Sequence, residues 1–327
     1  MSGLITVFWK ELADNFSSWR FIILFALVLL AGVFAIYVAA ENIREAVTET
    51  SKTYFAVAET IRFVFLKLYT TSGEAIPFSF LTFIVFFVPI VGIALGFDAI
   101  NSEKNSGTLS RLLSQPIFRD AVINGKFLAG VITMAIMLVS IVMLVAGIGL
   151  IRIGVPPSSE EILRLMAFLG AGIVYGAFWL GLAMLFSIFF QRVATSALAS
   201  IAVWIFFIFF MSMLAGLIAN MVVSVDQQST QQELVRNSEV YLVAMRISPI
   251  MLFSEATSVL LVPETRTMEQ LLQIQISPAT ARMLPNPLPL GQSVLMVLPH
   301  LVSLLALTVV CFAISYIRFM REEIRST

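Results

Sequence analysis

FSFLTFIVFFVPIVGIALGF (78–97) is an apolar run. It is followed by the polar segment DAINSEKNSGTLSRLLSQPIFR (98–119) and, a few residues later, by a second apolar run, FLAGVITMAIMLVSIVMLVAGIGLI (127–151). The two apolar runs contain no charged residue, and a helix of about 20 such residues crosses the hydrocarbon core of a bilayer. The polar segment, residues 98–119, must therefore lie at a membrane surface. Its acidic Glu103, its leucine pair and the break at Pro116 predict one short amphipathic helix with its own terminator.

The composition is that of a membrane protein. Hydrophobic residues make up 59% of the 327 residues, charged residues make up 12%, and the mean hydropathy is +0.96, whereas soluble domains contain about 45–50% apolar residues. The formal net charge is zero, so no basic or acidic region indicates nucleic acid as a partner. The single Cys311 lies in an apolar run, which excludes an intrachain disulfide and a multi-cysteine metal site. We expect it to pack as a small apolar side chain.

Six charge-free runs are long enough to span a bilayer as helices. They are Phe21–Ala40, Phe78–Phe97, Phe127–Ile151, Leu165–Phe190, Val193–Val225 and Met283–Ile317. The last run contains Pro285, Pro287 and Pro289, which move the start of its helix to about Ser293. The sequence thus predicts an all-α polytopic membrane protein, with one transmembrane domain over residues 1–327, about six transmembrane helices and both termini on one side.

Residues 1–20, which precede the first run, are amphipathic. Apolar residues recur there at helical spacing, and Trp9 and Trp19 are side chains typical of a membrane interface. We expect an N-terminal interfacial helix, and a plain helical extension of the first span is the alternative. The first run is not a cleavable signal peptide, because it is long and has no small-residue cleavage site before Glu41.

Lysine and arginine residues in the short connections favour a cytoplasmic location for both termini. This orientation places residues 98–126 and Gln191-Arg192 in the cytoplasm, and residues 41–77, 152–164 and 226–282 outside. We therefore expect a multi-pass protein of the cell (inner) membrane.

Two of the outer segments have helical patterns. Apolar residues recur at helical spacing over residues 41–68, which predicts an amphipathic helix on the outer surface. Residues 240–262 are apolar but are interrupted by Arg246, Pro249 and Glu255, so we expect short interfacial or re-entrant helices buried against protein. A seventh span at this position is the alternative.

The chain has no motif for catalysis or for binding a nucleotide. It lacks GxxxxGK[ST], HExxH, GxSxG and paired cysteines, so we expect no catalytic, metal-binding or cofactor-binding residue in it. His300 is expected to be a packed, neutral, hydrogen-bonded side chain, with a proton relay as the alternative. Because the spans carry no charged residue, an ion-coupled transporter is not favoured and the energy source must lie outside this chain. Small-xxx-small patterns predict close helix packing at Gly92, Gly96, Gly172, Gly176 and Gly181.

Residues in and around the polar segment follow a definite order: an acidic residue, Gly-Thr-Leu, a leucine pair, a proline, an arginine and a lysine. They are Asp98, Glu103, Gly107-Thr108-Leu109, Leu112-Leu113-Ser114, Pro116, Arg119 and Lys126. Trp9-Lys10-Glu11 near the N-terminus and Ser248-Pro249 with Phe253 before the last span add to the pattern. In this order the chain resembles the permease subunits of type-2 ABC exporters, which include the permease of the nitrous-oxide-reductase maturation system.

The resemblance implies a separate cytoplasmic ATPase subunit, which would bind the ATP, and a second permease subunit, identical or related, in the same lipid bilayer. It also implies that residues 98–119 form a cytoplasmic coupling helix that docks on the ATPase. The implied coupling residues are Glu103, Gly107, Thr108, Leu109, Arg111, Leu112, Leu113, Pro116 and Arg119. Among them Glu103 and Arg111 would supply orienting charges, the leucines an apolar anchor, and Gly107 a close backbone approach. The alternative is a helix packed on its own membrane domain with a solvated charged face.

Three classes of function fit the sequence to different degrees. The first is the permease subunit of an ATP-driven exporter. The second is an ATPase-coupled mechanotransmitter or lipid extractor that acts on an outer partner without moving a solute across the membrane. The third, a membrane enzyme, would need polar residues clustered at one membrane depth, which the charge-free spans lack.

Overall fold

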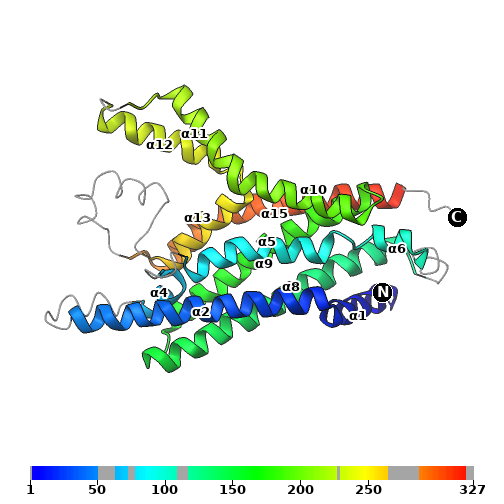
Figure 1. The fold of residues 1–327 in the computed structure, drawn as a ribbon, viewed down its shortest axis with the longest axis horizontal. Helices are drawn as coiled ribbons and strands as arrows, with labels where there is room; N and C mark the ends of the chain where they lie inside the picture. The colour runs from blue at the N-terminus through cyan, green and yellow to red at the C-terminus, as the bar shows by residue number, and fades with distance from the viewer. Residues whose placement is uncertain are drawn as a thin grey trace.

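The computed structural model describes residues 2–50, 63–72, 78–108, 117–226, 229–263 and 287–321, and these ranges contain helices and no strand. The six candidate spans lie side by side in Figure 1. The helices are α1 (Ser2–Ser17), α2 (Trp19–Thr50), α4 (Val64–Thr70), α5 (Phe80–Gly96), α6 (Asn101–Asn105), α8 (Arg119–Ile153), α9 (Ser159–Phe189), α10 (Val193–Ile205), the π-helix η1 (Phe206–Phe210), α11 (Met211–Val222), α12 (Gln231–Met245), α13 (Pro249–Leu261) and α15 (Leu290–Arg321).

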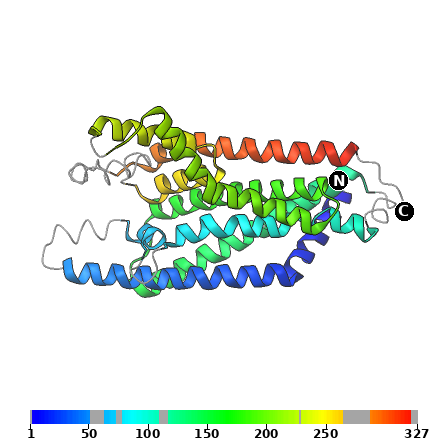
Figure 2. The ribbon, with the colours of Figure 1, turned by 45° about the horizontal axis from the view of Figure 1, so that its top comes forward.

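The prediction of six spans is confirmed. Helices long and apolar enough to cross a membrane are found at α2, α5 with α6, α8, α9, α10 through α11, and α15. The final helix begins at Leu290, directly after Pro289 and slightly earlier than predicted. Helix α1, α6 and the end of α15 lie at one end of the bundle, which we call the terminal end; α4 and α12 lie at the opposite end, the far end (Figures 1 and 2).

Helix α1 is a separate element, as predicted. It ends at Ser17, and α2 begins at Trp19 with a change of direction that is visible in Figure 2. The backbone N–H of Ser18 donates to the carbonyl of Asn15 at 3.2 Å, which closes the last turn of α1. The alternative of one continuous helix through residues 1–40 is therefore wrong.

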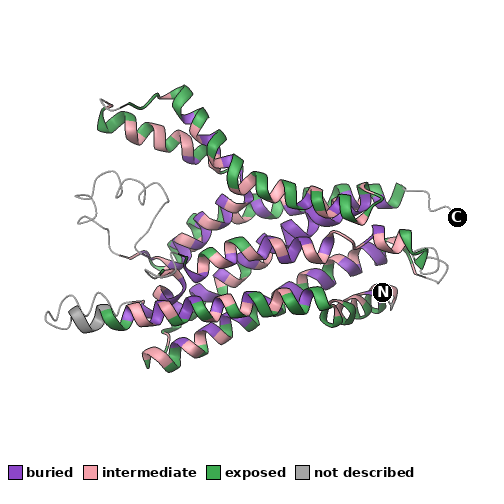
Figure 3. Ribbon diagram, viewed as in Figure 1, coloured by how far each residue is buried: buried purple, intermediate pink, exposed green. Residues whose placement is uncertain are grey.

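The core forms around α9, which packs against α5, α8, α10, α13 and α15. Of its apolar stretch 72% is buried, against 11% for the fifth span, and Figure 3 shows the exposed faces of α10 and α11. A Cβ atom on Gly96 of α5 would lie 2.8 Å from the carbonyl oxygen of Leu180 in α9, and one on Gly92 would lie 3.1 Å from the carbonyl oxygen of Gly176. These contacts confirm the predicted close helix packing at Gly92 and Gly96, and the helix that these residues approach is α9. Gly181 has ordinary contacts only, the nearest at 3.7 Å.

The prediction of one amphipathic surface helix over residues 41–68 is wrong for the residues that the structure describes. Helix α2 runs on to Thr50, and residues 51–62 lie outside the described ranges. The other end of the segment is the short helix α4, whose Phe65 and Leu68 are fully buried against the bundle. Of the apolar residues that suggested an amphipathic face, Ile43, Phe65 and Leu68 are described, and all three are buried; α4 packs against α2, α5, α8 and α9.

Residues 240–262 form parts of two helices, as predicted. Helices α12 and α13 are separated by a short break and bent by 115°, so they do not make a straight seventh span. Helix α13 is buried against α9 and α15. Pro249, at its first position, begins α13 because proline lacks the N–H that a helix interior would need.

Candidate functional site

The polar segment is not one helix, which corrects the prediction for residues 98–119. Helix α6 contains only five residues, and Gly107, just beyond it, has φ +68°. A residue in this left-handed region ends a right-handed helix, and glycine adopts it without steric cost. Among the described residues, no atom lies within 4 Å of the position of a Cβ on Gly107. A glycine is therefore needed at position 107 because of its backbone conformation and not because of a close contact with another part of the described chain.

The structure describes four of the nine predicted coupling residues. Glu103 lies in α6, Gly107 and Thr108 follow it, and Arg119 is the first residue of α8. Two hydroxyl groups close the turn after α6 onto the carbonyl oxygen of Glu103: that of Ser106 at 3.3 Å and that of Thr108 at 3.4 Å. The remaining five residues lie outside the described ranges: Leu109, Arg111, Leu112, Leu113 and Pro116.

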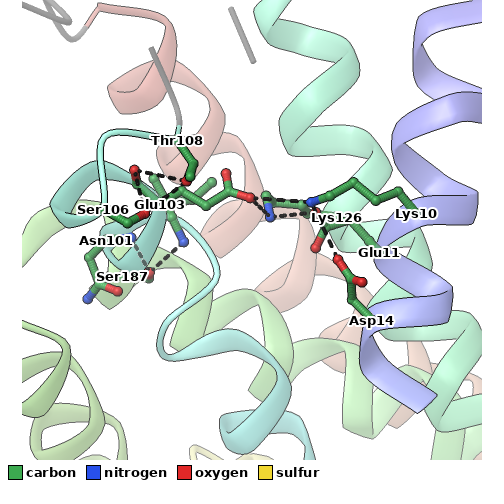
Figure 4. A network of polar contacts seen from close by, with 10 residues as sticks. Lys10, Glu11, Asp14, Asn101, Glu103, Ser106, Thr108, Lys126 and Ser187 are labelled. Atoms are coloured by element: carbon green, nitrogen blue, oxygen red, sulfur yellow. Dashed lines mark hydrogen bonds and ion pairs between the residues drawn. The ribbon is translucent and has the colours of Figure 1, made fainter. Parts of the chain in front are cut away.

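Glu103 turns inward to a cluster of charges that we call the Lys126 network: Lys10, Glu11 and Asp14 of α1, Glu103 of α6 and Lys126 of α8 (Figure 4). Lys126 Nζ lies 2.9 Å from Glu103 Oε1 and 2.8 Å from Glu11 Oε1. Lys10 Nζ lies 3.0 Å from the same Glu11 oxygen and 3.8 Å from Glu103 Oε1. One ammonium group thus joins three elements that are distant in the sequence.

The pairing of the network follows from its burial. The side chain of Lys126 is only 5% exposed, and those of Glu11 and Glu103 are 14% and 15% exposed. A buried ammonium needs carboxylate partners to offset the loss of water. Burial raises the pKa of the Glu11 carboxyl, but its ion pairs with Lys126 and Lys10 outweigh this and hold the pKa below its usual value. Glu11 is therefore ionised at neutral pH.

Lys10 is the more exposed cation of the network, with 49% of its side chain in contact with solvent. Burial lowers its pKa, but attraction to Glu11, Glu103 and Asp14 outweighs burial and raises the pKa above the usual value. A small cavity of about 150 Å³ lies beside the network and is also lined by Asp98, which forms an ion pair with Arg20 at the start of α2. Asp98 and the three carboxylates of the Lys126 network thus all have cationic partners within the chain.

Lys126 and Glu11 belong to the sequence motif, but no role for either residue was predicted. The available signal was the position of Lys126, one residue before a long charge-free run. A lysine at the edge of a membrane span must either extend its ammonium group to the membrane surface or pair with an acidic residue. The pattern could not identify that partner, because Glu11 lies on a different helix.

A second polar cluster lies at the far end, where it holds the bent pair α12 and α13 to α15. Glu255 is 2% exposed and accepts bonds from Arg246 at 2.9 and 2.6 Å. Its Oε2 also lies 3.0 Å from His300 Nε2, while His300 Nδ1 is buried without a partner among the described residues. Because an ionised carboxylate can only accept a hydrogen bond, Nε2 carries the proton of this contact. His300 is thus packed and hydrogen-bonded, as predicted.

Comparisons with known proteins identify the family to which the sequence is similar. A family model described as ABC-2 family transporter protein matches residues 5–324. A probable ABC transporter permease protein, NosY, of Pseudomonas aeruginosa is 29% identical over 142 residues. The match covers 42% of this chain and 50% of NosY, so the similarity extends over half of that relative's length.

Proposed function

We propose, because this chain belongs to the ABC-2 family and is the membrane subunit of an ABC transporter, that it couples ATP hydrolysis by a separate cytoplasmic ATPase to export across the cell membrane. The observation that carries the proposal is the Lys126 network, which ties the polar segment to α1 and α8 at one end of the bundle. A segment held in this way can pass a displacement to the membrane helices. The family's membrane subunit is not itself a catalytic enzyme.

In the proposed mechanism, two permease subunits, identical or related, each dock residues 98–119 on an ATPase subunit. Closure of the ATPase pair on ATP moves the segment, and α5 and α8, which flank it, move as rigid levers. Leu109, Leu112 and Leu113 supply the apolar contact and Arg111 an orienting charge. The family resemblance implies that Glu103 orients the ATPase by its charge, but we assign it a different role. Its side chain binds Lys126, so Glu103 holds the polar segment against the membrane domain.

The second candidate function, a mechanotransmitter or lipid extractor that acts on an outer partner, is favoured by the elements that extend from the far end. Helix α2 continues beyond its charge-free run, which ends at Ala40, as far as Thr50, and α12 projects from the bundle (Figure 1). These helices would offer an outer partner a surface. ATP-dependent release of lipid without transport of any solute would favour this candidate over the exporter.

Substitution of Leu112 by aspartate is expected to uncouple the permease from its ATPase without unfolding the membrane domain. An unpaired carboxylate in an apolar docking contact costs several kcal/mol. Co-purification of the ATPase and its stimulated turnover should both be lost, while the melting temperature of the permease alone stays unchanged. Ser17→Asp is the matched control, because it adds the same charge at an exposed position in α1, outside the polar segment. Undiminished co-purification with Leu112→Asp would overturn the proposed docking role.

We further propose that both termini and the polar segment are cytoplasmic. In a Cys311→Ala background, a cysteine at Ser106 should be shielded from a membrane-impermeant thiol reagent in intact cells, whereas cysteines at Ser159 and Gln232 should be labelled. All three positions are exposed, so their thiols can ionise and react. Labelling of the Ser106 position in sealed cells would contradict the proposal, because the segment would then face away from cytoplasmic ATP.

A further inference from the structure

The side of α6 that faces away from the Lys126 network is bonded to the end of α9. The Ser187 hydroxyl oxygen of α9 accepts the backbone N–H groups of Ile100 and Asn101 at 3.0 and 3.1 Å, and both Ser187 and Asn101 are fully buried. The first N–H groups of a helix have no acceptor within it. Because α6 has no side-chain cap of its own, Ser187 supplies one from another helix (Figure 4).

Two asparagines of α6 hold the connection between α9 and α10. Asn105 Nδ2 donates to the carbonyl oxygen of Gln191 at 3.0 Å, and Asn101 Nδ2 donates to that of Phe190 at 3.5 Å. The two side chains are four residues apart, so they lie on the same face of the helix. The connection is short, because α9 ends at Phe189 and α10 begins at Val193. A displacement of α6 must therefore act directly on the start of α10.

The span that begins at this connection is the one least restrained by the rest of the chain. Only 11% of its apolar stretch is buried, the smallest share among the six spans. Midway along it lies η1, where the N–H of Met211 donates to the carbonyl of Phe206 five residues earlier. π-Helical turns of this kind often occur at functional sites in helices. A weakly packed helix with an irregular turn can move at its base without disturbing the core.

We infer that Asn101, Asn105 and Ser187 are positioning residues that transmit movement of the polar segment to the fifth span. The Lys126 network contacts one side of α6, and the bonds of these three residues lie on the opposite side. The polar segment therefore acts on α8 and on α10 through separate contacts. This inference rests on the proposed function, because it assumes that ATP moves the segment. It adds a second route of transmission, which leads to α10 through the α9–α10 connection.

The inference is tested by distance measurements between spin labels in the permease–ATPase complex in lipid, with and without ATP. In a Cys311→Ala background, Leu198→Cys reports on α10 and Leu128→Cys reports on α8, each paired with Met166→Cys on α9; all three side chains are exposed. Asn105→Ala is expected to reduce the ATP-dependent displacement at Leu198 at least twofold and to leave that at Leu128 unchanged. Ser187→Ala is also expected to reduce the displacement at Leu198, because it removes the hydroxyl through which α9 holds the start of α6.

Ser200→Ala is the matched control. Ser200 is a buried serine of α10 whose hydroxyl donates to Ser196 O of its own helix, so the displacement at Leu198 should stay as in the parent chain. An unchanged displacement in both Asn105→Ala and Ser187→Ala, or an equal loss at Leu198 and Leu128, would overturn the inference alone. Absence of any ATP-dependent displacement in the parent complex would overturn the proposed function, and the inference with it.

Discussion

Replacement of Lys126 by methionine is expected to destabilise the membrane domain by about 3–5 kcal/mol, because it leaves buried carboxylates without their main partner. Glu11 and Glu103 both bind this one ammonium group and are mostly buried. Oε2 of Glu103 already has no hydrogen-bond partner among the described residues, so it cannot compensate. Denaturant unfolding in detergent measures the change, and ATPase stimulation should fall with it, since α6 would lose its attachment to α1 and α8.

Two further variants separate the buried pair from a general effect of charge. Lys10→Met removes a lysine of the same network that is 49% exposed, and exposed ion pairs contribute only about 0–1 kcal/mol. Adding Glu11→Gln and Glu103→Gln to Lys126→Met should restore most of the lost stability, because the unpaired charges are then gone. Equal losses in Lys10→Met and Lys126→Met would contradict the assignment of Lys126 as the centre of the network.

Replacement of Arg164 by methionine is expected to have a comparable effect at the far end. The guanidinium of Arg164 is fully buried and donates to the carbonyl oxygens of Leu260 and Leu288 at 3.1 and 2.5 Å, and to the Ser293 hydroxyl at 3.2 Å. It thus joins α9 to the end of α13 and the start of α15. Each buried acceptor left without a donor costs about 1–3 kcal/mol, so thermal unfolding should begin at a clearly lower temperature.

The matched control for Arg164 is Arg152→Met at the end of α8. Its guanidinium lies over the ring of Tyr37, 4.2 Å from the ring centre, a contact that contributes about 0.5–1 kcal/mol at an exposed site. We therefore expect a much smaller change in melting temperature for Arg152→Met. Equal shifts in the two variants would mean that the bonds of Arg164 do not hold α13 and α15 together.

The positions of the membrane-spanning helices along the chain could be predicted from local patterns alone. A charge-free run of about 20 residues in a bilayer must satisfy its backbone groups internally, and a helix does so whatever its neighbours are. The six spans, the separate helix α1 and the break at Pro249 follow from such signals. The break in the polar segment at Gly107 could not be predicted in the same way, because a glycine fits both a helix interior and the left-handed turn that the structure contains.

The sequence by itself determined which residues cross the membrane and where the polar segment lies along the chain, since hydrophobicity and helix breaks act within a few residues. Which partner each buried polar side chain contacts depends on the packing of the helices. Lys126 meets Glu11, Arg164 meets Leu288 and His300 meets Glu255 because their helices are neighbours in the bundle. The same packing buries α4, whose pattern suggested a surface helix. A buried charge or an apolar face needs a partner, because leaving either in the wrong surroundings costs free energy. A local sequence pattern shows that such a partner is needed, but only the packing of the helices determines which residue it is.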